Sequence, residues 1–151
     1  EPRVESYINN QAPQLDGALR TVPEGLELKE HGWKWVSQDE QPIHFGHAGF
    51  AHGWFTNEHH SKKHVQHMGA NIFYGHTHAF QAFSVTQGNQ PKIGMSIGSL
   101  ALRRRKWRNG CPVAWSHGML LMYLLEGGNF IHQFLPIIDG KTVFNGKLYS
   151  A

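Results

Sequence analysis

The sequence of 151 residues contains one cysteine, Cys111, so an intramolecular disulfide is excluded. It also lacks long apolar segments: the longest run, residues 119–125, has seven residues, whereas a helix that spans a bilayer needs about 20. No basic and then apolar segment typical of a signal peptide is present at its start. From these absences we expect a protein that has no membrane partner and is located in the cytoplasm, or in the host cytoplasm if the source is viral.

Charged residues are scarce as well. They make up 17% of the chain against 40% for hydrophobic residues, and the formal net charge is +3 with histidine neutral. A disordered chain needs low hydrophobicity and high net charge, so these values indicate a folded protein. The length suits one domain of roughly 100–200 residues. We therefore expect residues 1–151 to form a single domain.

Two residue types are abundant instead: the chain has 12 histidines and 17 glycines. Histidine is the commonest metal ligand and titrates near neutral pH, and glycine permits tight turns. The composition therefore points to metal or phosphate chemistry.

The first forty residues are expected to be helical and irregular, with short helices over 4–10 and around 23–30. Gly32 ends the second of them. From Trp33 onward apolar and polar residues alternate, as in a half-buried strand, and this pattern predicts that a sheet begins there.

A strand–helix–strand unit is predicted next. It consists of a short strand that ends near His52, a helix over 58–68 with Gly69 as its stop, and a buried strand over 71–74. The two strands of such a unit are parallel and are joined by a right-handed crossover.

Beyond His78 the pattern consists of strands separated by short turns rich in glycine, which is typical of β-hairpins. We expect these strands to be antiparallel, so that the fold class is α/β, with one strand–helix–strand unit followed by antiparallel strands. The expected strands are residues 80–86, 92–100, 118–125, 129–137 and 142–149.

Histidines follow both strands of the predicted unit. His52 comes at the end of the first strand, His76 follows the second, and His78 lies two residues further on. Ligands gather at the carboxyl ends of parallel strands, and Gly75 and Thr77 allow the backbone to turn sharply. The three imidazoles are therefore candidate metal ligands, with ordinary loop histidines of a histidine-rich protein as the alternative.

The run Gly75-His76-Thr77-His78, preceded by the strand over 71–74 and by His52-Gly53 across a helix, resembles the C-terminal half of the calcineurin-like metallophosphoesterases. The similarity is greatest to the subgroup often seen in phages and prophages, and it covers nearly all of the chain. It continues through Ser96-Ile97-Gly98, Trp115 with Gly118, Asp139-Gly140-Lys141 and residues 145–149.

The resemblance implies a partial β-sandwich flanked by helices and a site for two divalent metal ions, with manganese, iron, zinc and nickel as candidates. His52 and His76 would bind one ion and His78 the other. The family builds its site from five sequence blocks, of which this chain has the last two. Glu1 resembles the last residue of the third block, so we expect the N-terminal half, the bridging carboxylate and the histidine that contacts the leaving group upstream of Glu1.

The resemblance also implies an enzyme that hydrolyses phosphate esters, in the first place phosphodiesters, by means of a metal-bound hydroxide. Three imidazoles carry no negative charge to offset the repulsion between two cations, so this chain alone is expected to hold one ion at most, and weakly. Activity is thus expected of a longer protein. A missing half would leave a sheet edge uncovered, so a homodimer or a separate N-terminal half is the partner that we expect.

A basic segment offers an alternative function. Arg103, Arg104, Arg105, Lys106 and Trp107 form a patch that suits phosphate contacts and stacking on a base, although a solvated surface loop explains the same residues. The alternative is therefore a non-catalytic remnant that binds nucleic acid or a protein partner. A third hypothesis, a structural site for one zinc ion, predicts that a chelator unfolds the domain.

The other histidines are given less specific roles. His60, His64 and His67 share one face of the expected helix, and we interpret that face as solvent-exposed because Lys62 and Lys63 lie among them. We expect surface or supporting roles for His44 and His47, core packing for Trp115 near His117, and a structural role for Cys111.

Overall fold

The computed structural model describes residues 22–101 and 114–150, and the chain divides into two compact units, one ending at Ser37 and one beginning at Gln38. The described part of the first unit contains the short helix α2 (Val22–Gly25), which is followed by turns. A helix is thus present in the expected region, but it is shorter than the sequence suggested. The expected helix over 4–10, the basic segment and Cys111 lie outside the described residues.

The sheet does not begin at Trp33, so that prediction is wrong. Trp33 is 70% exposed and, like Trp35, belongs to no strand. The N–H of Trp33 donates to the carbonyl of Leu28, which closes a local turn. Alternation stabilises a strand only where a neighbouring strand takes up its hydrogen bonds, and the first strand with such a partner begins at Ile43.

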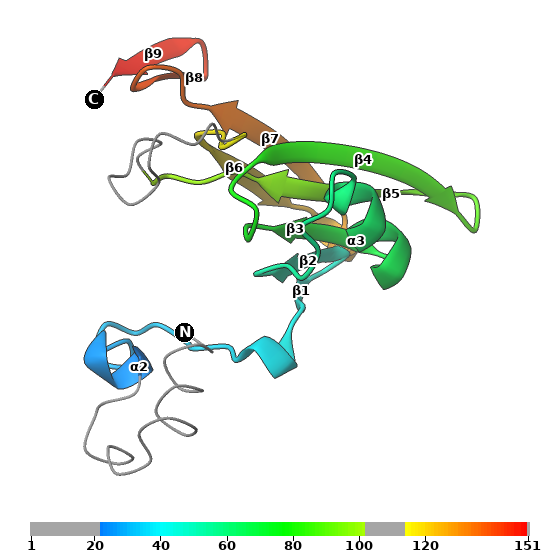
Figure 1. Ribbon diagram of the computed structural model, residues 1–151, viewed down its shortest axis with the longest axis horizontal. Coiled ribbons are helices and arrows are strands. Elements are labelled where there is room, and N and C mark those ends of the chain that lie inside the picture. The colour runs from blue at the N-terminus through cyan, green and yellow to red at the C-terminus, as the bar shows by residue number, and fades with distance from the viewer. Residues whose placement is uncertain (1–21, 102–113, 151) are drawn as a thin grey trace. The chain divides into compact units, whose positions relative to one another are not determined.

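The second unit contains a five-stranded sheet of order β1-β2-β3-β5-β4 (Figure 1). Strands β2 and β3 are parallel, as predicted, and β3 is also parallel to β5. Strands β1 and β4 pair antiparallel at the two edges. The strands are β1 (Ile43–Phe45), β2 (Ala48–Ala51), β3 (Asn71–Tyr74), β4 (Phe80–Gln87) and β5 (Gln90–Ile97).

Helix α3 (His60–Met68) connects β2 to β3 and covers one face of the sheet. It ends where the sequence predicts, because Gly69 adopts the left-handed conformation with φ of 60° and its N–H donates to the carbonyl of Val65. Val65 packs with Ile72 and Tyr74 of β3. The predicted strand–helix–strand unit is therefore confirmed.

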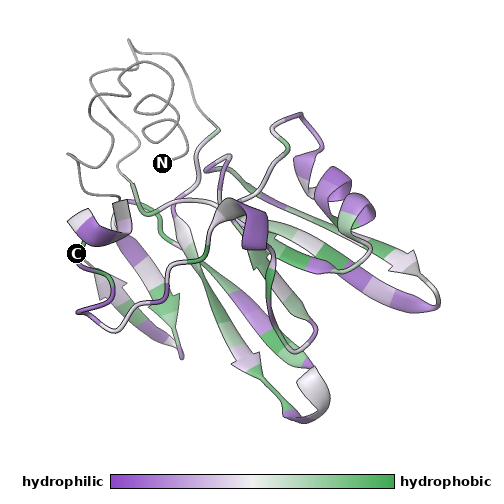
Figure 2. Cartoon of the chain, turned by 90° about the horizontal axis from the view of Figure 1, so that it is seen from below, coloured by the Kyte–Doolittle hydropathy of each residue, from purple (hydrophilic) through white to green (hydrophobic). Residues whose placement is uncertain are grey.

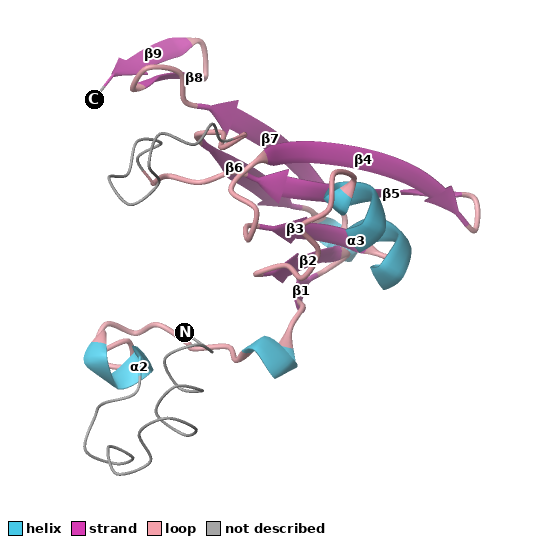
Figure 3. Cartoon of the chain, viewed as in Figure 1, coloured by secondary structure: helices cyan, strands magenta, loops and turns pink. Residues whose placement is uncertain are grey.

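A hairpin covers the opposite face of the sheet. It consists of β6 (Gly118–Leu124) and β7 (Phe130–Pro136), which pair antiparallel. Its apolar side chains pack on a buried cluster of Ala48, Phe73 and Met95. Layers of helix, sheet and hairpin result, and most of the described elements are strands (Figure 3). The fold is thus mixed α/β.

The last expected strand, residues 142–149, is in fact a second hairpin of β8 (Lys141–Phe144) and β9 (Lys147–Ser150). Asn145 and Gly146 have φ of 49° and 71°, which are the positive values that a two-residue hairpin turn requires. The Asn-Gly pair therefore interrupts the strand. Among the residues that the structure describes, no helix combines the length and the apolar character needed to span a membrane.

The close packing of α3 on the sheet generates a prediction. A Cβ at Gly94 of β5 would lie 2.4 Å from the carbonyl oxygen of Ser61, which is backbone and has no rotamer with which to move away. Gly94→Ala is therefore expected to lower the free energy of unfolding by about 3 kcal/mol in denaturant titrations. At Gly88 a Cβ meets no atom within 4 Å, so Gly88→Ala is expected to lower the free energy of unfolding by only about 1 kcal/mol, because φ is positive there. Equal losses in the two variants would contradict the observed packing.

Candidate functional site

The parallel pairing of β2 and β3 places two histidines at one edge of the sheet. Ala51 lies opposite Tyr74 in the ladder, so that His52 and Gly75 are the next residues of their chains. The pairing continues beyond the strands, because the Gly75 N–H donates to the His52 carbonyl over 3.0 Å. His76, which follows Gly75, is therefore delivered beside His52.

The imidazoles of His52 and His76 meet directly. Nε2 of His52 lies 2.9 Å from Nδ1 of His76, with ring centroids 4.8 Å apart and the rings at 68°. A hydrogen bond between two ring nitrogens needs one donor and one acceptor, so these two nitrogens share a single proton. Burial, followed by the charge of His52, lowers the pKa of His76 below its ordinary value.

This arrangement fits a metal ion. Two nitrogens that bind the same ion at about 2.0–2.1 Å lie about 2.8–3.4 Å apart when the angle between them is between a right angle and tetrahedral. The separation of 2.9 Å between Nε2 of His52 and Nδ1 of His76 falls within that range. An ion at about 2.0–2.1 Å from both nitrogens lies off the line that joins them, so both neutral imidazoles would turn toward it when it replaces the shared proton.

His78 does not join the pair. Its ring packs edge-on against Trp115, with centroids 4.6 Å apart. Its backbone N–H donates to the carbonyl of Gly75. Within residues 22–101 and 114–150, no group of three or more His, Cys, Asp or Glu side chains is placed to hold a metal ion. Of the three predicted ligands, the structure therefore brings two together.

The loop that carries His76 and His78 has an unusual backbone. The φ of His76 is 36° and that of His78 is 58°, both in the left-handed region. This region costs a residue with a Cβ about 1–2 kcal/mol, and such residues cluster at functional sites. Gly53, directly after His52, has φ of 109°, and a Cβ there would lie 2.8 Å from the Tyr74 ring. The backbone strain thus lies in the loop of His76 and His78, whereas Gly53 adopts its positive φ without strain because it has no Cβ.

One supporting contact of His52 was not foreseen from the sequence. The backbone N–H of His52 donates to Oε1 of Gln41 over 2.6 Å, which fixes the residue where β2 has ended. Gln41 lies in no motif and precedes β1, so no sequence pattern connects it with the site.

The interpretation of the α3 histidines as solvent-exposed is wrong for two of the three. His64 is fully buried and His60 is 5% exposed, whereas His67 is exposed and its ring contacts Phe55. Figure 2 shows that α3 is coloured mostly as hydrophilic, although it packs on the sheet. Burial is tolerated because the ring nitrogens find partners inside the protein.

His64 in particular connects three segments. Its Nδ1–H donates to the carbonyl of His60 over 2.7 Å, and its Nε2 accepts the N–H of Trp54 over 2.9 Å. The ring stacks on Tyr74 with centroids 3.8 Å apart. The bonding pattern requires neutral imidazole with its proton on Nδ1. His64 therefore ties α3 to the loop that follows His52.

Other expected roles are clearer in the structure. The side chains of His44 and His47 are exposed, as expected for surface positions. Nε2 of His117 donates to the carbonyl of Ala101, and the half-buried Trp115 packs on His78 instead of lying in the core. The expectation of core packing for Trp115 is thus wrong, because its ring lies beside the loop after β3.

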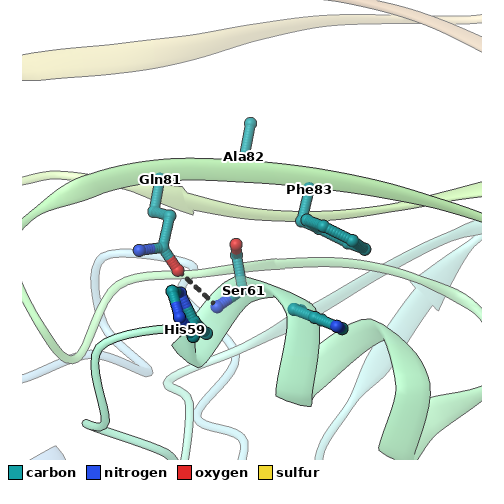
Figure 4. A pocket seen from close by; sticks show the side chains of 6 residues that line it. His59, Ser61, Gln81, Ala82 and Phe83 are labelled. Atoms are coloured by element: carbon teal, nitrogen blue, oxygen red, sulfur yellow. Dashed lines mark hydrogen bonds between the residues drawn. The ribbon is translucent and has the colours of Figure 1, made fainter.

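A hollow of about 300 Å³ lies between the first turn of α3 and β4 (Figure 4). Gln81 spans it: Oε1 accepts the N–H of Ser61 and Nε2 donates to the carbonyl of Glu58, over 2.8 and 2.7 Å. The ammonium of Lys62 lies 5.5 Å from the ring centroid of Phe83. Gln81 thus caps the N-terminus of α3, so its amide has a structural role in the hollow.

Comparisons with known proteins provide no relative from which the site can be interpreted. No family model matches the chain, and no curated protein and no solved structure is significantly similar to it.

The burial of His64 generates a prediction about pH. Burial is the main cause that lowers the pKa of His64 from its ordinary 6.5. The unfolded chain then binds this proton more readily than the folded one, so stability is retained above 6.5 and is lost as the pH falls below that value. His64→Gln, which does not titrate, is expected to lose less stability than wild type between about pH 7 and pH 5.

The free energy of unfolding from urea titrations at each pH measures this effect. His59→Gln, which removes an exposed histidine next to α3, is the matched control and should follow the wild-type profile. A His64→Gln profile with the wild-type slope would show that His64 does not couple protonation to folding.

Proposed function

We propose that the chain supplies His52 and His76 to a divalent metal centre of a calcineurin-like metallophosphoesterase that hydrolyses phosphate esters, phosphodiesters in particular. The observation that carries the proposal is the 2.9 Å separation of Nε2 of His52 and Nδ1 of His76 at the carboxyl edge of parallel strands. The mixed α/β arrangement of a sheet between a helix and a hairpin is compatible with half of that family's sandwich.

The residues of this chain would bind and orient. His52 and His76 would hold one ion through neutral imidazoles, which suit zinc, manganese, iron or nickel. When bound, the metal centre supplies a hydroxide at neutral pH and balances charge on the phosphate. The hydrogen bond from the backbone N–H of Gly75 to the carbonyl of His52 holds the two ligands side by side at the edge of the sheet.

The proposed centre needs further ligands. Two cations at close range repel each other unless carboxylates compensate their charge, and no carboxylate joins the histidine pair within the described residues. In this proposal the carboxylates belong to the sequence blocks that the chain lacks, and His78 belongs to the second ion. The separation of His78 from the pair is compatible with that division.

The alternative function, binding of nucleic acid or a protein through Arg103, Arg104, Arg105, Lys106 and Trp107, stays a prediction because that segment lies outside the described residues. Its signature is an affinity for DNA or RNA that falls steeply with added salt.

A first experiment measures the binding of Co²⁺ to the chain by isothermal titration calorimetry. Wild type is expected to bind one ion, and His52→Ala and His76→Ala are each expected to weaken this binding by more than about 100-fold, because each removes one of two protein ligands. His31→Ala, which removes an exposed histidine from the first unit, is the control and should bind as wild type does. Equal affinity in all four proteins would refute the proposed centre.

A second experiment measures hydrolysis of bis(p-nitrophenyl) phosphate with added Mn²⁺. A longer protein that includes the family's upstream blocks is expected to hydrolyse it, with a loss of more than about 100-fold in His76→Ala. The chain of 151 residues alone is expected to be nearly inactive. Turnover by this chain at the rate of the longer protein would contradict a shared site.

A further inference from the structure

A buried hydroxyl group lies under the loop that carries His76 and His78. Ser96, on β5, is fully buried and lies opposite Tyr74, the last residue of β3. Its Oγ–H donates to the carbonyl of Gly75 over 3.3 Å, and its Oγ lies 3.1 Å from Oγ1 of Thr77. A hydroxyl has one proton, and that of Ser96 is used on the carbonyl. Thr77 is therefore the donor to Ser96.

These bonds act on the part of the loop whose backbone is least favourable. Thr77 lies between His76 and His78, which both have positive φ. The carbonyl of Gly75 accepts the N–H of His78 in addition to the hydroxyl of Ser96. Hydrogen bonds thus hold the loop at Gly75 and at Thr77, on either side of His76.

Packing alone does not explain a serine at this position. Ser96 follows Met95 of the apolar core, and a buried hydroxyl lowers stability unless it is hydrogen-bonded. The hydrogen bonds of the Ser96 hydroxyl go to Gly75 and Thr77 of the loop. The hydroxyl therefore serves the conformation of the loop.

We propose that Thr77 and Ser96 are positioning residues: their hydroxyl pair holds the backbone in the conformation that directs Nδ1 of His76 at Nε2 of His52. The inference rests on the proposed function for its consequence, metal affinity. Its geometric content, the contact between the two imidazoles, is independent of any metal.

Thr77→Val tests the proposal with the least disturbance, because valine keeps the branched shape of threonine and removes only the hydroxyl. Thr77→Ser restores the hydroxyl without the methyl group and is the rescue variant. Ser84→Ala is the matched control: Oγ of Ser84, which is exposed on β4, also donates to a carbonyl, that of Lys92 on β5. Ser96→Ala removes the second hydroxyl of the pair.

The first readout uses no metal. A ¹⁵N–¹H correlation spectrum through the carbon-bound ring protons, recorded at alkaline pH, identifies the protonated nitrogen of each ring without depending on exchange with water. In wild type, the nitrogen that faces the other ring is expected to be protonated in one of His52 and His76 and unprotonated in the other, because their hydrogen bond needs one donor and one acceptor. Thr77→Val and Ser96→Ala should show a mixture of tautomers at both rings, whereas Thr77→Ser and Ser84→Ala should show the wild-type tautomers. Wild-type tautomers in Thr77→Val would overturn the positioning role, even if Ser96→Ala fails to fold.

The second readout is the affinity for Co²⁺. Thr77→Val is expected to bind Co²⁺ roughly 10–100-fold more weakly than wild type, and Thr77→Ser within about threefold of it, since partners that orient a ligand have effects of this size. A merely structural role would lower the melting temperature of Thr77→Val without changing the affinity of the folded protein. Unchanged affinity would contradict the proposal.

The two readouts separate the failure of this inference from that of the proposed function. If wild type binds Co²⁺ no better than His76→Ala does, the metal centre is refuted while the imidazole spectrum still decides the role of Thr77 and Ser96. If the metal binds but Thr77→Val changes neither readout, the positioning role is refuted and the centre stands.

Discussion

The hydrogen bond from the N–H of Gly75 to the carbonyl of His52 is the contact on which the candidate site depends. It extends the parallel ladder of β2 and β3 by one step beyond the strands. Because each residue advances a strand by about 3.3 Å, a shift of register by one residue would move the imidazoles of His52 and His76 apart. The register in turn is fixed by the core: Ala48 and Phe73 face the hairpin, and Ile72 and Tyr74 face α3.

Two groups of histidines have opposite roles around this contact. His60 and His64 belong to the buried face of α3, where their ring nitrogens bond to Tyr74 and to backbone groups. The pair of His52 and His76 lies at the rim, where Nε2 of His52 meets Nδ1 of His76. An imidazole whose two nitrogens are both bonded within the core supports a fold, whereas two ring nitrogens at the separation of two ligands of one ion offer a place for a cation. The partners of the ring nitrogens therefore distinguish the two groups of histidines, which a count of histidines in the sequence cannot do.

Local signals in the sequence predicted much of this fold. Gly69 as the end of α3, the strand Asn71–Tyr74 and the crossover between parallel strands all follow from short-range patterns. The parallel pairing of β5 with β3 was not foreseen, since it depends on contacts between distant segments. The burial of His64 was missed for the same reason: its partner Trp54 lies outside the helix, so the helix pattern alone could not account for both nitrogens.

The site was predicted in part. The approach of His52 to His76 follows from their places after two parallel strands, because the topology alone brings such positions together. Gln41 bonds to the backbone of His52, and Ser96 bonds to Gly75 and Thr77, but no spacing rule connects Gln41 or Ser96 with the histidines. His78 contacts Trp115, which is far along the chain, so no local pattern predicts that contact.

The most direct test of the central claim, that His52 and His76 together hold a metal ion, is to locate that ion. Crystals of the chain grown with one equivalent of Zn²⁺ and measured at the zinc absorption edge give an anomalous difference map that does not depend on activity. The claim predicts the strongest peak at about 2.0–2.1 Å from both Nε2 of His52 and Nδ1 of His76. A strongest peak on other histidines, with none between these two rings, would contradict it.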